Sequence, residues 1–349
     1  NFLMAQLQPI KTALLSFGMS GRVFHAPFIH LHSGFELLGS WERSNQVIND
    51  HYPYVKSYHS IDEILEDDKV ELVVVNTPTY THYEYTKKVL EAGKHAVVEK
   101  AFVGKTSEAE ELAALAKSKG LKLSVFQNRR FDSDFKTVQR LLKTGQLGDI
   151  IEARIAFDRW RPELSPKTHK EKPSDGAGII KDLGAHVIDQ ALTLFGMPKS
   201  VFADIGITRE GSEVDDYFDI LLKYDKTRVH VHGGYFFKDQ LPGFILYGSK
   251  GSFMKSRADV QEDQLQAGMK PDNEQYGIEP IDEKGVLHID SRKGQMPTEI
   301  GDYKEYYEGI YQSIRNGAEE PVTAADGVNV MRVIDAAFES AEKGLVVKL

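Results

Sequence analysis

The stretch "KDLGAHVIDQALTLF" (residues 181–195) carries the acidic and basic side chains best placed for catalysis. On a helix, Asp182, His186 and Asp189 stand at positions i, i+4 and i+7 and form one polar stripe. Beside it runs an apolar stripe that would face a core, formed by Leu183, Val187, Ala191 and Leu194. A glycine in mid-helix, Gly184, costs about 1 kcal/mol relative to alanine, which indicates that another group approaches the backbone there. This arrangement is typical of a cavity wall.

Three interpretations of this stripe stay open from the spacing alone. Asp182 and His186 could be an acid–base pair in an active site, or His186 could be a core histidine satisfied by a neighbouring aspartate. The two could also hold a metal, since two ligands four residues apart on a helix can bind zinc. No third ligand is obvious by spacing, the chain has no cysteine, and no His-Glu-x-x-His sequence occurs. We therefore predict that the protein has no metal site.

A lysine, Lys100, follows the apolar run "HAVVE" (95–99). Standing alone, it would be a surface lysine at the end of a strand. If that strand lies in the centre of an open α/β sheet, the side chain projects into the crevice where such proteins bind ligands. There an ammonium group can hold a substrate hydroxyl and help to remove its proton.

The six residues "SFGMSG" (16–21) nearly spell a dinucleotide-binding turn. The expected pattern is Gly-x-Gly-x-x-Gly; Gly18 and Gly21 match it, and Ser16 stands in the first position. Serine suits that position if its φ stays negative, and its hydroxyl can bond to the loop. The alternative is a chance pair of glycines, but a turn between a first strand and a first helix could hold a pyrophosphate. The predicted contacts in the turn are Ser16, Phe17, Gly18, Met19, Ser20 and Gly21.

The end of the second predicted strand gives mixed signals about the adenosine ribose. Glu42, 21 residues beyond Gly21, could accept hydrogen bonds from a ribose 2′-hydroxyl, as NAD enzymes require. Arg43 and Ser44 offer a guanidinium fork and a hydroxyl, which suit the 2′-phosphate of NADP. Arg43 could also merely cover the adenine face, which would leave no preference.

Short apolar runs alternate with helical patterns as far as about residue 128. This rhythm predicts a parallel, doubly wound sheet with helices on both faces, an α/β Rossmann-type domain over residues 8–128. In the remainder, a helix predicted from about Gly178 to Phe195 precedes a run of strand patterns, and two helices close the chain. Residues 129–349 are therefore predicted to form an α+β domain with a large, mostly antiparallel sheet.

Polar residues follow each predicted strand of the first domain. In an open α/β sheet, ligands bind outside the carboxyl ends of the strands, so these residues together indicate a lined crevice. The cofactor contacts predicted outside the glycine turn are Glu42, Arg43, Asn76, Thr77, Pro78, His82, Glu99, Lys100 and Asn128.

Composition limits the classes of partner. The 349 residues carry a net charge of −9, and the pI is near 5.8, which argues against nucleic acid or an anionic membrane as the main partner. The absence of cysteine excludes disulfides and a cysteine nucleophile and fits the cytoplasm, where we expect the protein to act. We find no apolar run of membrane-spanning length and expect no secretory signal before Gln6.

Several segments together resemble the glucose–fructose oxidoreductase, inositol dehydrogenase and MocA family (Gfo/Idh/MocA), and most of all its branch of NADP-linked scyllo-inositol dehydrogenases. The resemblance covers nearly all of the chain. The matching segments are "SFGMSGRVFHAPFI", "VVVNTPTYTH", "GKHAVVEKAF", "SVFQNRRFDSDF", "GAGIIKDLGAHVIDQAL" and "PVTAADGVNVMRVIDAAFESAEKG". Two departures are Ser16, in place of the first glycine, and Ala101, in place of the proline of a Glu-Lys-Pro segment.

The resemblance implies a reversible hydride transfer between a secondary alcohol of a cyclic polyol or sugar and nicotinamide, with NADP preferred to NAD. It implies that His186 is the general base and that Lys100 bonds the same substrate oxygen. Asp182 would orient Lys100 or His186, and Asp189 would bond another substrate hydroxyl. Family members associate through the outer face of the C-terminal sheet, so a homodimer or homotetramer is expected.

Trp160, Arg161 and Tyr235 are further candidate substrate contacts, and each could equally be structural.

Two other functions remain as alternatives. A methyltransferase would also have a glycine-rich turn after its first strand, and a non-catalytic nucleotide sensor would keep the fold, although such a protein tends to lose its proton-transfer residues.

Overall fold

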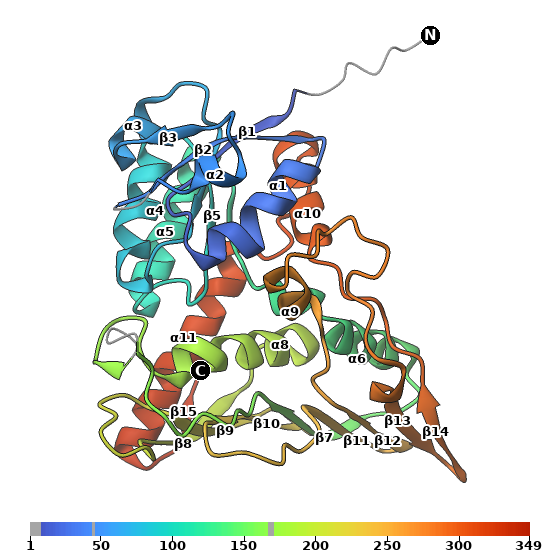
Figure 1. Cartoon of the computed structure of the whole chain (residues 1–349). Coiled ribbons are helices and arrows are strands. Elements are labelled where there is room, and N and C mark those ends of the chain that lie inside the picture. Colours follow the sequence, from blue (N-terminus) through green and yellow to red (C-terminus); the bar gives the residue numbers. More distant parts are fainter. Residues whose placement is uncertain (1–7, 44–45, 167–170) are drawn as a thin grey trace.

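The computed structural model describes residues 8–43, 46–166 and 171–349 and contains two sheets, one above the other in Figure 1. The first sheet has six strands in the order β3-β2-β1-β4-β5-β6, and all neighbouring strands pair in parallel. Its strands are β1 (Ile10–Leu14), β2 (Phe35–Trp41), β3 (Lys56–Tyr58), β4 (Leu72–Val75), β5 (His95–Val98) and β6 (Leu123–Val125). The doubly wound parallel sheet is thus confirmed.

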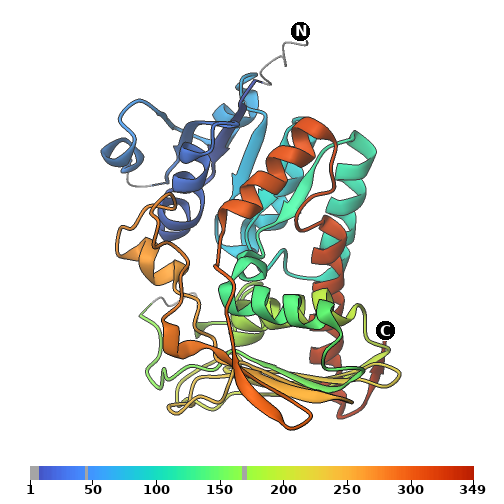
Figure 2. The same cartoon turned by 90° about the vertical axis from the view of Figure 1, so that its right-hand side faces the viewer.

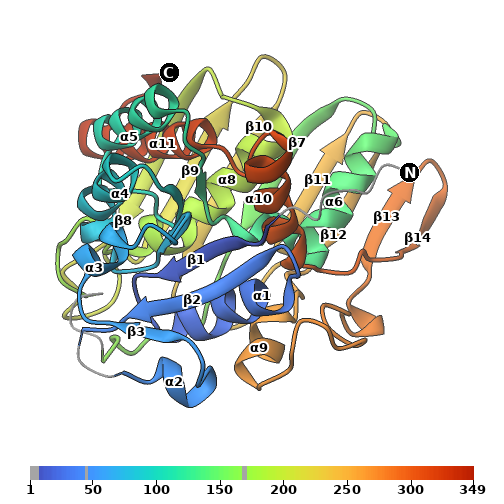
Figure 3. The ribbon, with the colours of Figure 1, turned by 90° about the horizontal axis from the view of Figure 1, so that it is seen from above.

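Helices cover both faces of this sheet, and Figure 3 shows β1, β2 and β3 side by side with α1 beneath them. They are η1 (Gly21–His25), α1 (Ala26–Leu31), α2 (Ile48–His51), α3 (Ile61–Glu66), η2 (Thr79–Thr81), α4 (His82–Glu91) and α5 (Thr106–Lys119). The side chain of Ser60 accepts a hydrogen bond from the N–H of Glu63 and caps α3. Gly120, with φ 66°, ends α5 in the left-handed conformation that glycine adopts freely.

The second sheet has nine strands in the order β14-β13-β12-β11-β7-β10-β9-β8-β15. Its pairs are antiparallel except β7 with β10, which is parallel, so the sheet is mixed. The strands are β7 (Ile150–Ala156), β8 (Ser200–Gly206), β9 (Tyr217–Lys223), β10 (Arg228–Gly234), β11 (Phe244–Gly248), β12 (Gly251–Lys255), β13 (Gly285–Ile289), β14 (Arg292–Met296) and β15 (Val347–Lys348).

Helices lie between the two sheets. The elements of this layer and of the connections around it are η3 (Asn128–Phe131), α6 (Ser133–Thr144), η4 (Ile180–Gly184), α8 (Ala185–Phe195), α9 (Gln261–Gln266) and η5 (Ile281–Glu283). In Figure 1, α6 and α8 lie directly on one face of the second sheet. On that face β9 places Phe218, Ile220 and Leu222, which are fully buried, while the alternate residues stay partly exposed.

The last two helices, α10 (Lys304–Asn316) and α11 (Ala324–Lys343), return to the first sheet, as Figure 2 shows. The hydroxyl of Ser124 in β6 donates to the carbonyl of Val322 at 2.7 Å. The Phe126 ring meets the Tyr306 ring at 4.8 Å between centroids. Although they come last in the sequence, α10 packs against the predicted cofactor-binding half, and α11 runs from α5 and β6 to β8 of the second sheet, so it joins the two halves.

Candidate active site

A groove of about 540 Å³ opens at the carboxyl ends of β1, β2 and β4. It is bordered by the glycine turn, the end of β2 and the segment after β4. Its lining includes seven of the predicted cofactor contacts: Ser16, Phe17, Gly18, Glu42, Arg43, Thr77 and Pro78.

The glycine turn is built for close approach of the backbone. A Cβ on Gly21 would lie 2.5 Å from the carbonyl oxygen of Ser16, so no other residue fits without a shift of the main chain. The Ser16 hydroxyl accepts a hydrogen bond from the N–H of Gly18 at 3.2 Å, as predicted for a serine in the first position. Asn76 donates to the Ser16 carbonyl at 2.8 Å and supports the turn from β4. The turn therefore fits the pyrophosphate of a dinucleotide.

Glu42 is engaged by the backbone. Its two carboxylate oxygens accept hydrogen bonds from the N–H groups of Val47 and Ile48, both at 3.1 Å, at the N-terminus of α2. This helix is only four residues long. Arg43 is exposed at the groove, and Ser44 lies outside the described residues.

A largely buried carboxylate, Glu99, lies between the turn and Lys100. One of its oxygens accepts from the Ser20 hydroxyl at 2.8 Å and lies 3.0 Å from Nε2 of His25. Nδ1 of His25 lies 2.6 Å from the hydroxyl of Tyr307 in α10. Burial alone would raise the pKa of Glu99, but the hydrogen bonds from His25 and Ser20 and the charge of Lys100 hold it below its usual value. The sequence predicted Ser20 and Glu99 as cofactor contacts but missed His25 and Tyr307.

The other predicted cofactor contacts have different surroundings. His82 is buried, with Nε2 at 2.7 Å from the carbonyl of Thr77 and Nδ1 at 2.9 Å from that of Ala101, and burial lowers its pKa. It joins the end of β4 to the segment after Lys100. Met19 is 44% exposed, whereas Phe17 and Asn128 are buried.

Lys100 and Asp182 come together from the two halves of the chain. Nζ of Lys100 lies 2.6 Å from the carboxylate of Asp182 and 2.7 Å from its main-chain carbonyl. Asp182 belongs to η4, a π-helical turn, where the sequence predicted regular α-helix. Gly184 ends this turn, and its Cβ would lie 3.4 Å from the ring of Phe218, which is the close neighbour that a mid-helix glycine predicted.

His186 lies beside this pair and is buried. Its Nδ1 is 3.0 Å from Oε1 of Gln127, at the carboxyl end of β6. An amide oxygen only accepts, so Nδ1 carries the proton and Nε2 keeps a free lone pair. Burial, with the positive charges of Lys100 and Arg129, lowers the pKa of His186 well below its usual 6.5. A neutral imidazole of this tautomer can accept a proton at neutral pH.

Asp189, the third member of the stripe, faces another partner. Its carboxylate forms a two-point pair with Arg130, at 2.6 and 2.8 Å, and is 1% exposed. Arg130 also reaches Asp326 of α11 at 3.3 Å. Both oxygens of Asp189, which was predicted to bond a substrate hydroxyl, are thus paired with Arg130, and its contact with the substrate stays a prediction.

The three weaker substrate candidates divide between two faces. Arg161 donates its N–H to the Tyr235 carbonyl at 2.8 Å, so the two residues lie on paired segments. Trp160 is 47% exposed, and its ring meets that of Phe236 at 6.1 Å. Because side chains alternate along a strand, Trp160 points away from the side of Arg161.

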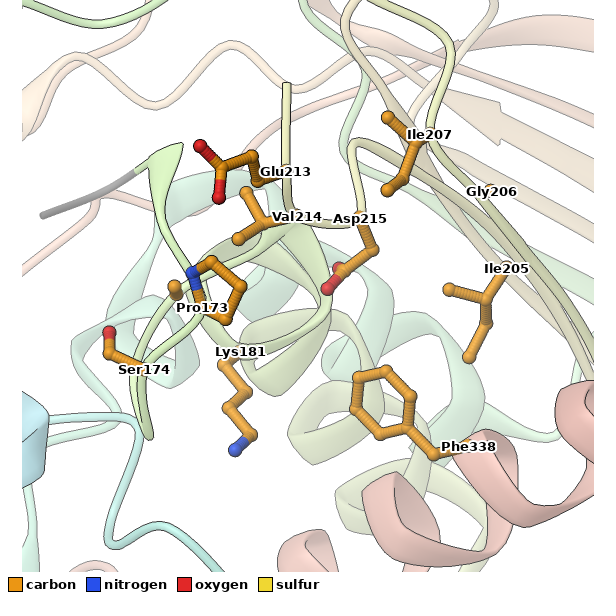
Figure 4. A pocket seen from close by; sticks show the side chains of 11 residues that line it. Pro173, Ser174, Lys181, Ile205, Gly206, Ile207, Glu213, Val214, Asp215 and Phe338 are labelled. Carbon is orange, nitrogen blue, oxygen red and sulfur yellow. The ribbon is translucent and has the colours of Figure 1, made fainter. Parts of the chain in front are cut away.

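A second cavity, of about 370 Å³, lies between α11, β8 and two loops (Figure 4). Lys181 is among its lining residues and donates to the carbonyl of Gly104 at 3.1 Å. None of the predicted site residues lines it.

Within the described ranges, no three His, Asp or Glu side chains gather as metal ligands, and no helix is long and apolar enough to cross a membrane. The absence of a metal stays a prediction.

Comparison with known proteins agrees with this geometry. Residues 10–127 match the family model for the NAD-binding Rossmann fold of the oxidoreductase family, and residues 139–349 match the model for its C-terminal alpha/beta domain. The chain is 37% identical over 348 residues to the scyllo-inositol 2-dehydrogenase (NADP(+)) IolW of Bacillus subtilis, covering 99% of this chain and 97% of the relative.

Solved structures have the same fold. The protein yvaA of Bacillus subtilis has a TM-score of 0.94 and 37% identity, covering 99% of each chain. A structure from Bacteroides fragilis has a TM-score of 0.90 and 42% identity, covering 98% of this chain and all of the other.

Fold, groove and polar cluster thus define an oxidoreductase that uses NAD or NADP. The family models and the full-length relative then give the family: the chain belongs to the Gfo/Idh/MocA oxidoreductases. The chain is therefore an oxidoreductase, and this assignment is preferred to the methyltransferase and the non-catalytic sensor.

Proposed function

We propose that this enzyme transfers a hydride between a secondary alcohol of a cyclic polyol or sugar and nicotinamide, with NADP preferred. The observation that carries the proposal is the buried, neutral His186 beside the Lys100–Asp182 pair. A relative that is named a scyllo-inositol 2-dehydrogenase supports the substrate class.

In the proposed reaction, Nε2 of His186 accepts the proton of the substrate hydroxyl, and Nδ1–H stays bonded to Gln127. Nζ of Lys100 donates a hydrogen bond to the same oxygen and stabilises its developing negative charge. Asp182 holds Lys100 in place. A bound nicotinamide would supply the acceptor for the hydride that leaves the carbon bearing this oxygen.

The preference for NADP rests on the end of β2. Both oxygens of Glu42 accept hydrogen bonds from the N-terminus of α2. This carboxylate is therefore less available to bind the ribose 2′-hydroxyl of NAD. Arg43 at the groove offers the guanidinium that a 2′-phosphate needs.

We also propose that residues 8–128 bind the cofactor, that residues 129–349 supply the substrate pocket, and that the protein forms a cytoplasmic homodimer or homotetramer through the outer face of the second sheet. Phe202, Tyr247 and Met254 of that sheet are 43%, 41% and 37% exposed, which suits a partner surface.

The test is a screen of inositols and aldoses with NADP and with NAD, followed at the nicotinamide absorbance. We expect turnover of at least one cyclic polyol or sugar, and faster with NADP. Turnover limited to straight-chain alcohols, or to none of the compounds, would contradict the proposal.

A further inference from the structure

Three arginine side chains meet on one buried aromatic ring where the two halves of the molecule join. The guanidinium carbons of Arg129, Arg159 and Arg257 lie 5.6, 4.6 and 4.5 Å from the centroid of the Phe157 ring. They come from separate segments, which follow β6, β7 and β12. Positive charge is therefore concentrated at the edge of the candidate active site.

Two of these arginines are engaged in the fold. Arg129 forms an ion pair with Glu262. Arg257 donates to the main-chain carbonyl of Ala156 at 2.5 Å and to the side chain of Gln190 at 2.7 Å. These contacts give Arg129 and Arg257 a structural role between neighbouring segments.

Arg159 is different. Over residues 8–43, 46–166 and 171–349, no side chain or carbonyl accepts a hydrogen bond from its guanidinium, whose contact is the face of Phe157. Residues 1–7, 44–45 and 167–170 contain no Asp or Glu that could pair with it. Burial, with the nearby charges of Arg129 and Arg161, lowers the pKa of Arg159. The charges of Glu262 and Asp182 act in the opposite direction, but neither carboxylate forms an ion pair with Arg159 within the described residues. A half-buried cation with no carboxylate in direct contact is stabilised by a ligand that supplies one.

Arg159 lies near the reacting groups. Beyond β7 the chain continues along the segment after β10: the N–H of Arg159 donates to the carbonyl of Gly234 at 2.9 Å. Arg161 follows two residues later, and its charge acts on Arg159, so the two guanidinium groups belong to one positively charged region. The charge of Asp182, the partner of Lys100, also acts on Arg159.

We propose that Arg159, together with Arg161, binds an anionic substituent of the substrate, a carboxylate or a phosphate group. The inference rests on the proposed function and narrows its substrate class to acidic sugars, or polyols that carry a phosphate. A planar guanidinium matches both groups with two parallel hydrogen bonds. Stacking on Phe157 holds the fork in one orientation before the ligand arrives.

The test compares matched neutral and anionic compounds on the enzyme with bound cofactor. kcat/KM is measured for D-glucose, D-glucuronate, glucose 6-phosphate, myo-inositol and an inositol monophosphate. Binding of D-glucose and D-glucuronate to the NADPH complex is measured by calorimetry, which does not require turnover. The variants are Arg159→Gln, Arg159→Lys and the control Arg154→Gln; Arg154 lies on β7, five residues before Arg159, is exposed, and pairs with Glu152 at 2.7 Å.

We expect one anionic compound to exceed its neutral counterpart by at least about tenfold, and Arg159→Gln to remove this advantage, as loss of a charged hydrogen bond does. Arg159→Lys should restore part of it, and Arg154→Gln should change nothing. The carboxylate and phosphate arms identify which anion is bound.

Turnover of neutral polyols with no anionic advantage would overturn the inference and leave the proposed function standing. Binding of glucuronate that depends on Arg159, without turnover of any compound, would support the anion site and contradict the polyol chemistry. If neither turnover nor binding occurs, both fail.

Discussion

The two sides of the active site are built by different means. On the cofactor side, amide and hydroxyl hydrogen bonds hold the turn, as in Asn76 to the Ser16 carbonyl, and the carboxylate that reaches it, Glu99, bonds the Ser20 hydroxyl and the His25 imidazole. On the substrate side, charges are matched in pairs: Lys100 with Asp182, and Asp189 with Arg130. Backbone geometry suits a ligand that is the same for many enzymes, whereas side-chain pairs can differ between enzymes when both members change together, so specificity is expected to reside in the second half.

The largest effect should come from the reacting groups. Lys100→Met and His186→Ala should each lower kcat at least ~100-fold, the lower scale of acid–base catalysis. NADPH binding should survive His186→Ala, since that residue belongs to the substrate side. The control is Lys105→Met, whose side chain is 64% exposed. Near-normal turnover in either variant would refute the mechanism.

The next largest effect should be a loss of NADPH affinity with the substrate side unchanged. Gly21→Ala places a methyl group 2.5 Å from the Ser16 carbonyl oxygen and should weaken NADPH binding by about tenfold or more, as overpacking costs ~1–3 kcal/mol. Fluorescence titration with NADPH measures it. Gly294→Ala is the control, because nothing lies within 4 Å of its Cβ position. Unchanged affinity would mean that the turn is not where the dinucleotide binds.

Arg43→Ala tests the preference of the cofactor side for NADP over NAD. Losing one charged hydrogen bond to a 2′-phosphate should lower kcat/KM for NADP by about tenfold and leave that for NAD nearly unchanged. The ratio of the two constants is the readout, with Arg292→Ala on the remote strand β14 as control. The assignment is wrong if the parent favours NAD or if both cofactors lose equally.

A smaller effect concerns pH. Because burial and the charges of Lys100 and Arg129 lower the pKa of His186 below 6.5, the base is already neutral at pH 6.5. kcat/KM should therefore stay level from pH 8 through 6.5 and fall only at lower pH, as the imidazole takes up a proton. A profile whose acid limb has its midpoint at or above 6.5 would show that another group titrates, or that His186 is not the base.

Removal of metal ions is expected to have no effect on activity. Prolonged chelation should leave activity intact, and elemental analysis should find no stoichiometric zinc. Activity that is lost and then restored only by zinc would make Asp182 and His186 metal ligands instead of an acid–base pair.

Local patterns predicted the parts of this molecule that depend on neighbouring residues. The glycine turn and the alternation of strands and helices in the first domain follow from short motifs and periodicity. The parallel pairing of β7 with β10 could not be predicted, because it joins segments about 75 residues apart.

The same limit applies to the site. Lys100, Asp182 and His186 were identifiable by type and spacing, but Gln127 and Arg130 were not, since their partners come from a distant helix. Glu42 was predicted as a ribose contact because its position matched a motif, and spacing does not reveal that its oxygens already serve the backbone of α2.

The return of α10 and α11 to the first sheet affects the order in which the protein can be completed during synthesis. Phe126 and Ser124 find their partners Tyr306 and Val322 only after nearly the whole chain has left the ribosome. Gly327 likewise packs against Val125 of β6, where its Cβ would approach to 2.7 Å. The first domain therefore keeps one flank of its sheet uncovered until residues 304–343 have been synthesised, and the nascent chain depends on α10 and α11 to close it.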